Sequence, residues 1–285
     1  MVAEMPWPEN RQRQDPWSTG TPARRWPVKF ANQSDLSSPP AALYATPPNQ
    51  PCPLLSAVMI KIFIGFDPCE CVAFHVLSHS IQARASEPVS ICPLMLTQLK
   101  GKMTRPQDPM QSTEFAFSRF LVPSLCDFEG WAIFMDCDML VVDDIANLWA
   151  RRDDAYAVMC VQHDHVPQET SKFLDRPQTI YERKNWSSVM LFNTAKCRTL
   201  TPDYVNSASG LQLHRFQWLE DDAEIGEIPH RWNHLVDYDP VLPIAEISNL
   251  HWTVGGPYFE KYGGSSYADL WFAERDATFH VDHFK

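Results

Sequence analysis

Two carboxylates interrupt an otherwise apolar segment of this 285-residue chain. Asp136 and Asp138 lie two positions apart within residues 131–142, whose other members are all apolar. A carboxylate in an apolar interior is costly unless it is paired or binds a metal. Alternate residues of a strand share one face, so the two side chains can converge while Cys137 points away. Two oxygen ligands of this kind suit Mg²⁺ or Mn²⁺ and a phosphorylated ligand that shares the ion.

The elements that must position these carboxylates follow an alternating pattern of strands and helices. We expect strands at 59–66, 89–91, 132–135, 155–161 and 188–192, helices around 73–81, 113–121 and 211–219, and a short helix to Trp149 capped by Asp143 or Asp144. Such alternation predicts an α/β domain with a mostly parallel central sheet. Ligands of these sheets bind beyond the carboxyl ends of the strands, where Asp67, Asp136 and Asp138 fall.

The first 57 residues differ in composition from the rest of the chain. They carry eleven prolines between positions 6 and 53 in a polar sequence without apolar periodicity. Such a segment buries too little apolar surface to offset its ordering entropy. We therefore expect residues 1–57 to form a disordered Pro-rich arm and residues 58–285 to form a single domain.

Composition excludes several classes of partner. The net charge of −11 argues against a nucleic-acid binder, which needs clustered Lys and Arg. No run of about 18 apolar residues occurs, so no transmembrane segment is expected, and no signal peptide is evident at the N-terminus. The eight cysteines include no CxxC pair, which indicates reduced thiols and a cytoplasmic location, and no zinc site is expected.

Five segments, in order along the chain, carry a resemblance to a known family. They are residues 62–67, 117–123, 134–138, 185–193 and 251–257, the last reading His-Trp-Thr-Val-Gly-Gly-Pro. Residues 59–285 thereby resemble nucleotide-sugar glycosyltransferases of the Rossmann-like GT-A fold, and within them family 8, the group of glycogenin and lipopolysaccharide galactosyltransferase. The order and spacing of all five segments are more specific than the Asp-Cys-Asp motif alone.

The resemblance implies a role for each matching residue. Asp136, Asp138 and His251 would bind Mn²⁺ or Mg²⁺ on the donor diphosphate. The donor itself would be bound by six residues: Asp67 near the nucleotide base, Arg119 near the sugar or phosphate, Asn185 and Trp186 in the sugar pocket, and Gly255 and Gly256 where backbone approaches the diphosphate.

The implied activity is hexosyl transfer from a nucleotide-diphosphate sugar, by resemblance a UDP-sugar, with retention of configuration. The acceptor would be a hydroxyl group of a glycan or lipid-linked molecule, which is compatible with peripheral membrane contact. A cation held by Asp136 and Asp138 would stabilise the charge that develops on the leaving diphosphate. No residue is identified as the catalytic base.

Three details depart from the family pattern. The Lys-Pro-Trp that usually follows the late glycine is replaced by Pro257-Tyr258, and Lys261 comes four positions late. Ser187-Ser188 occupies the place of a family glycine, and His251 lies one residue farther from its glycine than usual. The donor identity and the closure of the site therefore stay open.

Other interpretations of the same residues also stay open. Haloacid-dehalogenase-like phosphatases place a similar acidic pair after a strand, although Leu140 here occupies the position of their Thr. A nucleotide-sugar-binding module without turnover would need the same residues. Individually, Asp67 could serve a turn with Pro68, Arg119 could be an exposed helix residue, and Trp186 could belong to the core.

Overall fold

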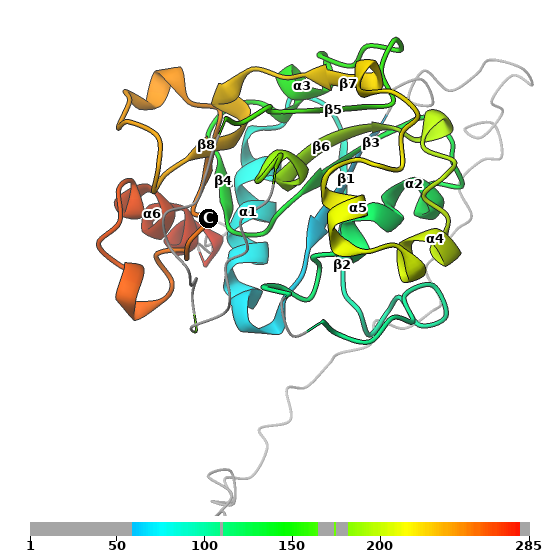
Figure 1. Cartoon of the computed structure of the whole chain (residues 1–285). Helices are drawn as coiled ribbons and strands as arrows, with labels where there is room; N and C mark the ends of the chain where they lie inside the picture. Colours follow the sequence, from blue (N-terminus) through cyan, green and yellow to red (C-terminus); the bar gives the residue numbers. More distant parts are fainter. Residues whose placement is uncertain (1–58, 109–110, 165–173, 175–181, 280–285) are drawn as a thin grey trace, which may run out of the picture. The chain divides into compact units, whose positions relative to one another are not determined.

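The computed structural model describes residues 59–108, 111–164, 174 and 182–279, which belong to one compact unit (Figure 1). The predicted arm, residues 1–57, lies outside the described residues, and its disorder stays a prediction. Among the described residues, no helix is both long enough and apolar enough to cross a membrane.

A six-stranded sheet forms the centre of the described unit. Its strand order is β2 (Val89–Leu94), β1 (Ile60–Gly65), β3 (Trp131–Met135), β6 (Val189–Asn193), β5 (Val158–Cys160) and β7 (Ile225–Glu227). All five predicted strands are present, and the α/β class is confirmed. The sheet is mixed, however, because β6 runs antiparallel to both β3 and β5, while the other three pairs are parallel. The wholly buried β6 carries no alternation from which its direction could be inferred.

A second, three-stranded sheet was not predicted. It consists of β4 (Met139–Val141), β9 (Asn249–His251) and β8 (His234–Leu235), with β9 in the middle. The chain leaves the large sheet at the end of β3 and enters the small sheet at β4, so Asp136 and Asp138 lie in the link between the two sheets.

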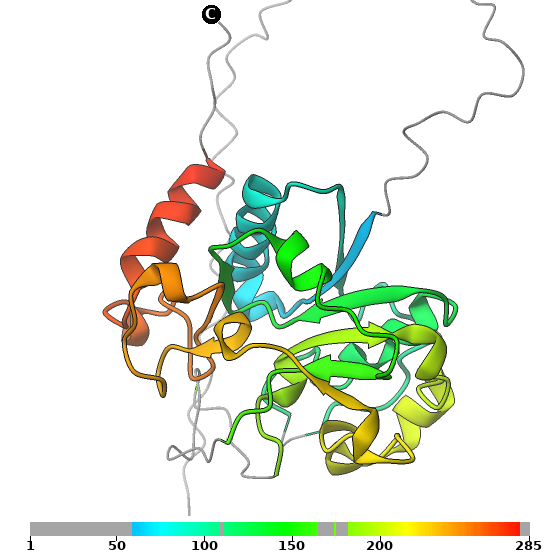
Figure 2. The same cartoon turned by 90° about the horizontal axis from the view of Figure 1, so that it is seen from above.

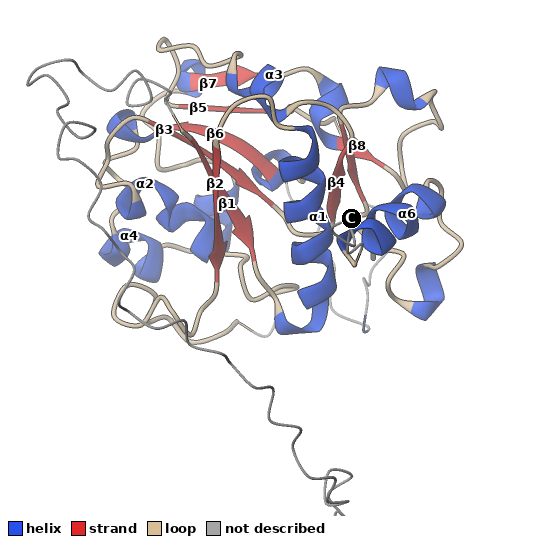
Figure 3. Ribbon diagram, turned by 180° about the vertical axis from the view of Figure 1, so that it is seen from behind, coloured by secondary structure: helices blue, strands red, loops and turns tan. Residues whose placement is uncertain are grey.

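Helix α1 (Cys71–Arg84) packs between the two sheets (Figures 2 and 3). Leu77 and Ile81 join the core of the large sheet, whereas Val76 packs with residues of the small sheet and of α6 (Ala268–Thr278). This arrangement fixes the small sheet against the end of β3, where the two carboxylates emerge.

The remaining helices are short: α2 (Val122–Leu125), α3 (Ile145–Trp149), α4 (Pro202–Ser207) and α5 (Gly210–His214). Asp144 caps α3 by accepting a hydrogen bond from the Ala146 amide, as predicted. The predicted helix 113–121 is wrong: turns lead into a 3-10 helix, Ser118–Leu121. Phe115 and Phe117 are both buried, although residues two apart do not share a helix face. Burial of both rings therefore overrides the local pattern.

The predicted helix 211–219 is shorter in the structure. Helix α5 ends at His214, and Phe216 adopts a left-handed backbone with φ of 57°. A non-glycine residue rarely adopts this conformation, and it turns the chain away from the helix axis.

Candidate metal centre

The structure brings Asp136, Asp138 and His251 together at the end of β3. His251 is the last residue of β9, and the antiparallel register pairs it with Met139, the residue after Asp138. One ligand atom from each of the three side chains lies within 4.8 Å of the other two, and His251 Nε2 lies 3.3 Å from Asp138 Oδ1. Residues 113 positions apart in sequence thus form one cluster, and their role as metal ligands stays a prediction.

A buried arginine pairs with the first carboxylate. Arg119 Nη1 lies 2.8 Å from Asp136 Oδ1 and also donates to the Ser187 carbonyl at 2.8 Å. Arg119 is only 5% exposed, so the interpretation of Arg119 as an exposed helix residue is wrong. The guanidinium fixes Asp136 and ties the Asp-Cys-Asp link to the segment that precedes β6.

Carboxylates gather around the Asp-Cys-Asp link. Burial raises the pKa of the Cys137 thiol, and the surrounding carboxylates of Glu70, Asp138, Asp136 and Asp67 raise it further. Two carboxylates and an imidazole are donors that suit Mn²⁺ better than Ca²⁺. The donor set therefore fits a divalent cation.

Asn233 orients the imidazole of His251. Asn233 Oδ1 lies 2.8 Å from His251 Nδ1, and Asn233 Nδ2 donates to the Asn185 carbonyl at 3.2 Å. Because the amide nitrogen is used in the second bond, the oxygen faces His251 and accepts from Nδ1. Nε2 is then the ring nitrogen on the side of Asp138, the one that a metal ion would use. Sequence reasoning missed Asn233, since nothing in its local pattern relates it to His251.

We expect Asn233→Leu to weaken Mn²⁺ binding by roughly 10- to 100-fold, the usual effect of removing a partner that orients a ligand. Isothermal titration of the variant measures this change. Asn249→Leu is the matched control, because Asn249 is also a buried amide but donates to the Trp232 carbonyl instead. Equal Mn²⁺ affinities for the two variants would show that Asn233 does not orient His251.

Asn185 combines a left-handed backbone with a side-chain amide donor, Nδ2, that lacks a hydrogen-bond partner among the described residues. Its φ is 66°, its Oδ1 accepts from Thr253 Oγ1 at 3.3 Å, and it is 6% exposed. Its Nδ2 is buried and has no hydrogen-bond partner among the described residues. Strain and an unsatisfied buried donor are typical of ligand-binding positions. The place of Asn185 in a sugar pocket stays a prediction.

Asp67 and Trp186 have structural partners as well as predicted roles. Asp67 is buried and accepts from the amides of Cys69 and Glu114, at 2.9 and 3.1 Å. Trp186 Nε1 donates to the His163 carbonyl at 2.8 Å, and the indole ring packs against Phe216. The turn role of Asp67 and the packing role of Trp186 are thus present, and their contacts with donor stay predictions.

Gly255 and Gly256 have a packing reason to be glycine. A Cβ atom on Gly255 would lie 2.3 Å from the Tyr262 ring, and one on Gly256 would lie 2.1 Å from the Tyr258 ring. Tyr258 in turn donates to Glu70 Oε1 at 2.6 Å, which ties this loop to the start of α1. The approach of the diphosphate to these glycines stays a prediction.

His214 contacts the segment at Ser187, which precedes β6. It contacts Ser187 Oγ through Nδ1 at 2.8 Å and lies against the rings of Phe117 and Phe120. Burial holds the pKa of His214 well below its usual value, and the positive charge of Arg119 lowers it further. The imidazole is therefore neutral in the folded protein.

We expect this histidine to make the protein sensitive to acid. As the pH falls below about 6.5, the unfolded chain takes up a proton on His214 that the folded chain does not, so stability falls. Urea unfolding at pH 7.5 and 5.5 should show a smaller loss for His214→Gln than for the parent. The control, His75→Gln, replaces an exposed histidine. If His214→Gln and His75→Gln lose the same stability on acidification, the assignment is wrong.

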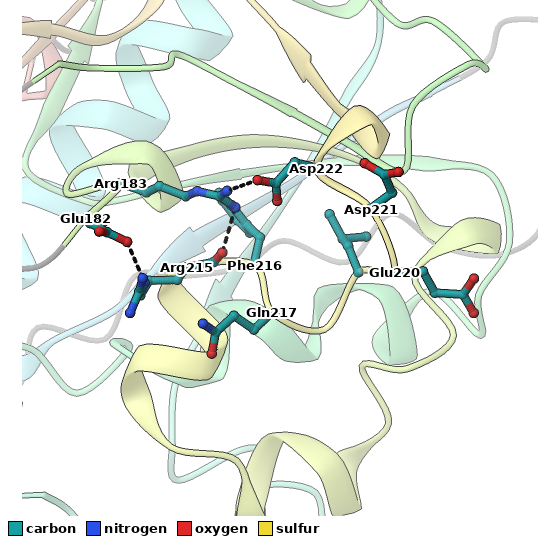
Figure 4. A pocket seen from close by; sticks show the side chains of 9 residues that line it. Glu182, Arg183, Arg215, Phe216, Gln217, Glu220, Asp221 and Asp222 are labelled. Carbon is teal, nitrogen blue, oxygen red and sulfur yellow. Dashed lines mark hydrogen bonds and ion pairs between the residues drawn. The ribbon is translucent and has the colours of Figure 1, made fainter.

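The surface pocket in Figure 4 lies elsewhere and contains none of the predicted site residues. Its volume is about 320 Å³, and its two arginines are already paired, Arg183 with Asp222 and Arg215 with Glu182. Asp221 caps the adjoining turn by accepting from the Ala223 amide. These charges are thus used within a surface turn.

Comparison with known proteins identifies the class of fold and a sequence relative of this chain. The structure resembles the bifunctional glycosyltransferase WbbM, with a TM-score of 0.53 and 14% identity over 76% of this chain and 49% of WbbM. It also resembles the glycosyltransferase GlyE of Streptococcus pneumoniae TIGR4, with a TM-score of 0.51 and 12% identity over 76% of this chain and 60% of GlyE. The chain thus spans about half of WbbM and three-fifths of GlyE. The fold is the GT-A glycosyltransferase fold, as the resemblance predicted.

A curated protein is similar to this chain in sequence. It is 48% identical to Protein CDI of Arabidopsis thaliana over 223 residues, which cover 76% of this chain and 86% of that protein. The chain belongs to the family of Protein CDI. No family model matches it.

Proposed function

We propose that this protein is a metal-dependent hexosyltransferase that uses a nucleotide-diphosphate sugar, with a UDP-sugar as the first candidate. The observation that carries the proposal is the convergence of Asp136, Asp138 and His251 where the chain passes between the two sheets. The GT-A fold supports it, because ligands of α/β sheets bind beyond the carboxyl ends of the strands. The acceptor is proposed to be a hydroxyl group of a glycan or lipid-linked molecule.

The residues of the chain have defined tasks in this proposal. Asp136, Asp138 and His251 hold Mn²⁺ or Mg²⁺, and Arg119 keeps Asp136 in place. When bound, such a cation stabilises the charge that develops on the departing nucleoside diphosphate. Asn185 Nδ2 donates a hydrogen bond to the donor sugar. Retention of configuration is proposed from the family resemblance alone.

The phosphatase alternative has less support. A nucleophilic aspartate must reach a phosphorus atom, whereas Asp136 Oδ1 is paired with a buried guanidinium at 2.8 Å. The GT-A fold also favours sugar transfer. A cytoplasmic location and peripheral membrane contact stay predictions.

Thermal-shift measurements on the full chain test the proposal. A panel of nucleotide-sugars is added with and without Mn²⁺, and at least one donor is expected to raise the melting temperature only when Mn²⁺ is present. Stabilisation by a donor without nucleoside diphosphate release would favour the binding-module alternative. Equal stabilisation with and without the metal would contradict the metal assignment.

A further inference from the structure

A second group of metal-ligand side chains lies beside β8, an edge strand of the small sheet. It consists of His230, His234 and Asp239, which lie on the 3-10 helix His230–Asn233, at the start of β8 and on the turn that follows (β8, Figure 1). One ligand atom of each lies within 4.8 Å of the other two. None of the three belongs to the candidate metal centre, and the sequence patterns did not single them out.

Both imidazoles face the same carboxylate oxygen. Asp239 Oδ2 lies 2.6 Å from His230 Nε2 and 3.6 Å from His234 Nδ1. The Leu235 amide also donates to this oxygen, at 2.7 Å, which fixes the carboxylate between the two rings. Three donors from one short segment, with spacings of four and five residues, thus converge on a common point.

The two imidazoles differ in exposure. His234 is 1% exposed and turns Nδ1 toward Asp239. His230 is half-exposed, and the ring of His163 lies edge-on to it at 4.9 Å between centroids, which restricts its orientation. The group therefore has one enclosed side and one side open to solvent.

We propose that His230, His234 and Asp239 form a second metal site that binds Zn²⁺. Two imidazoles and one carboxylate are a usual set of three protein ligands for zinc, with a fourth position left for water or another ligand. This donor set is richer in nitrogen than Asp136, Asp138 and His251, so the two sites differ in metal preference. The proposal does not depend on any sugar-transfer activity.

The second site is connected to the first through the backbone. His234 directly follows Asn233, the residue that contacts His251 Nδ1, and β8 pairs with β9 in the register Leu235↔His251. Zinc at the second site cross-links the residues on both sides of Asn233. Binding there restrains the segment that orients His251, so the second ion has a structural role.

Metal titration of the untagged full chain tests this proposal. The background protein carries Asp138→Asn to weaken the first site, and Cys69→Ser with Cys71→Ser because both cysteines are exposed thiols that could bind zinc. We expect one equivalent of Zn²⁺ by isothermal titration, and visible d–d absorption on Co²⁺ addition. His230→Ala or Asp239→Asn in this background should lower the Zn²⁺ affinity by more than roughly 10- to 100-fold. That range is the usual effect of removing a residue that only orients a metal ligand.

His75→Ala is the matched control, since it removes an exposed histidine from α1. His230 is half-exposed, so its replacement is expected to leave the fold intact, and circular dichroism checks this. Failure of the background protein to bind Zn²⁺ or Co²⁺ would overturn the proposal. The same affinity in His230→Ala and His75→Ala would also overturn it and leave Asp239 as the ion-paired cap of a turn.

Discussion

Replacing Asp138 with asparagine is expected to abolish Mn²⁺-dependent turnover while leaving the fold intact. Asp138 is buried, and its Oδ1 faces His251 Nε2 at 3.3 Å. Asparagine has the same shape but lacks the charge that a divalent cation requires. Loss of one group that stabilises developing charge usually costs about 10²- to 10³-fold in rate, and loss of a direct metal ligand should cost at least that much.

The measurement is nucleoside diphosphate release with Mn²⁺ titrated into parent and variant, with calorimetry of Mn²⁺ binding in parallel. Asp143→Asn is the matched control, because Asp143 is another partly buried aspartate near the small sheet that accepts from Ser248 and Asn147 instead. We expect Asp143→Asn to bind Mn²⁺ like the parent. Full Mn²⁺-dependent turnover in Asp138→Asn would remove Asp138 from the metal centre.

The second large effect is expected at Arg119, in stability as well as activity. Arg119→Met leaves Asp136 as a buried carboxylate without its guanidinium partner. Breaking a buried ion pair in this way typically costs about 3–5 kcal/mol, and the loss of the hydrogen bond to the Ser187 carbonyl should also displace the segment at Ser187. Arg119→Lys is expected to recover only part of this loss, because an ammonium lacks the fork geometry of a guanidinium.

Urea unfolding measures the effect, and a double-mutant cycle assigns its cause. Arg119→Met with Asp136→Asn should be more stable than Arg119→Met alone, because no buried charge is then left unpaired. The packing control is Arg105→Met: Arg105 lies over the Phe117 ring and donates to the Val205 and Ala208 carbonyls rather than pairing with Asp136. A double variant no more stable than Arg119→Met would show that packing, and not charge, dominates.

Most strands of the large sheet could be predicted from the sequence, whereas those of the small sheet could not. Strand β1 and strand β3 are long apolar runs that end at acidic residues, so they could be predicted together with the placement of Asp67 and Asp136. Strands β4, β8 and β9 have three residues or fewer. Such short strands carry no periodic signal, and the pairing of β4 with β9 joins residues more than 100 positions apart.

The same limit applies to the candidate site. Asp136 and Asp138 are marked by their apolar surroundings, and His251 could be connected to them only through the family resemblance. The contact between Asn233 and His251 and the ion pair between Arg119 and Asp136 arise from tertiary packing. Neither has a local sequence pattern, because the partners lie 18 and 17 residues apart on different elements.

The most direct test of the central proposal is nucleoside diphosphate release from a panel of nucleotide-sugars by the full chain, in the presence of Mn²⁺ or of a chelator. The account predicts release from at least one donor with Mn²⁺, its loss with the chelator, and its loss in Asp138→Asn with the same amount of folded protein. Release that is unchanged by both the chelator and Asp138→Asn would contradict it, as would a folded parent protein that neither binds nor cleaves any donor.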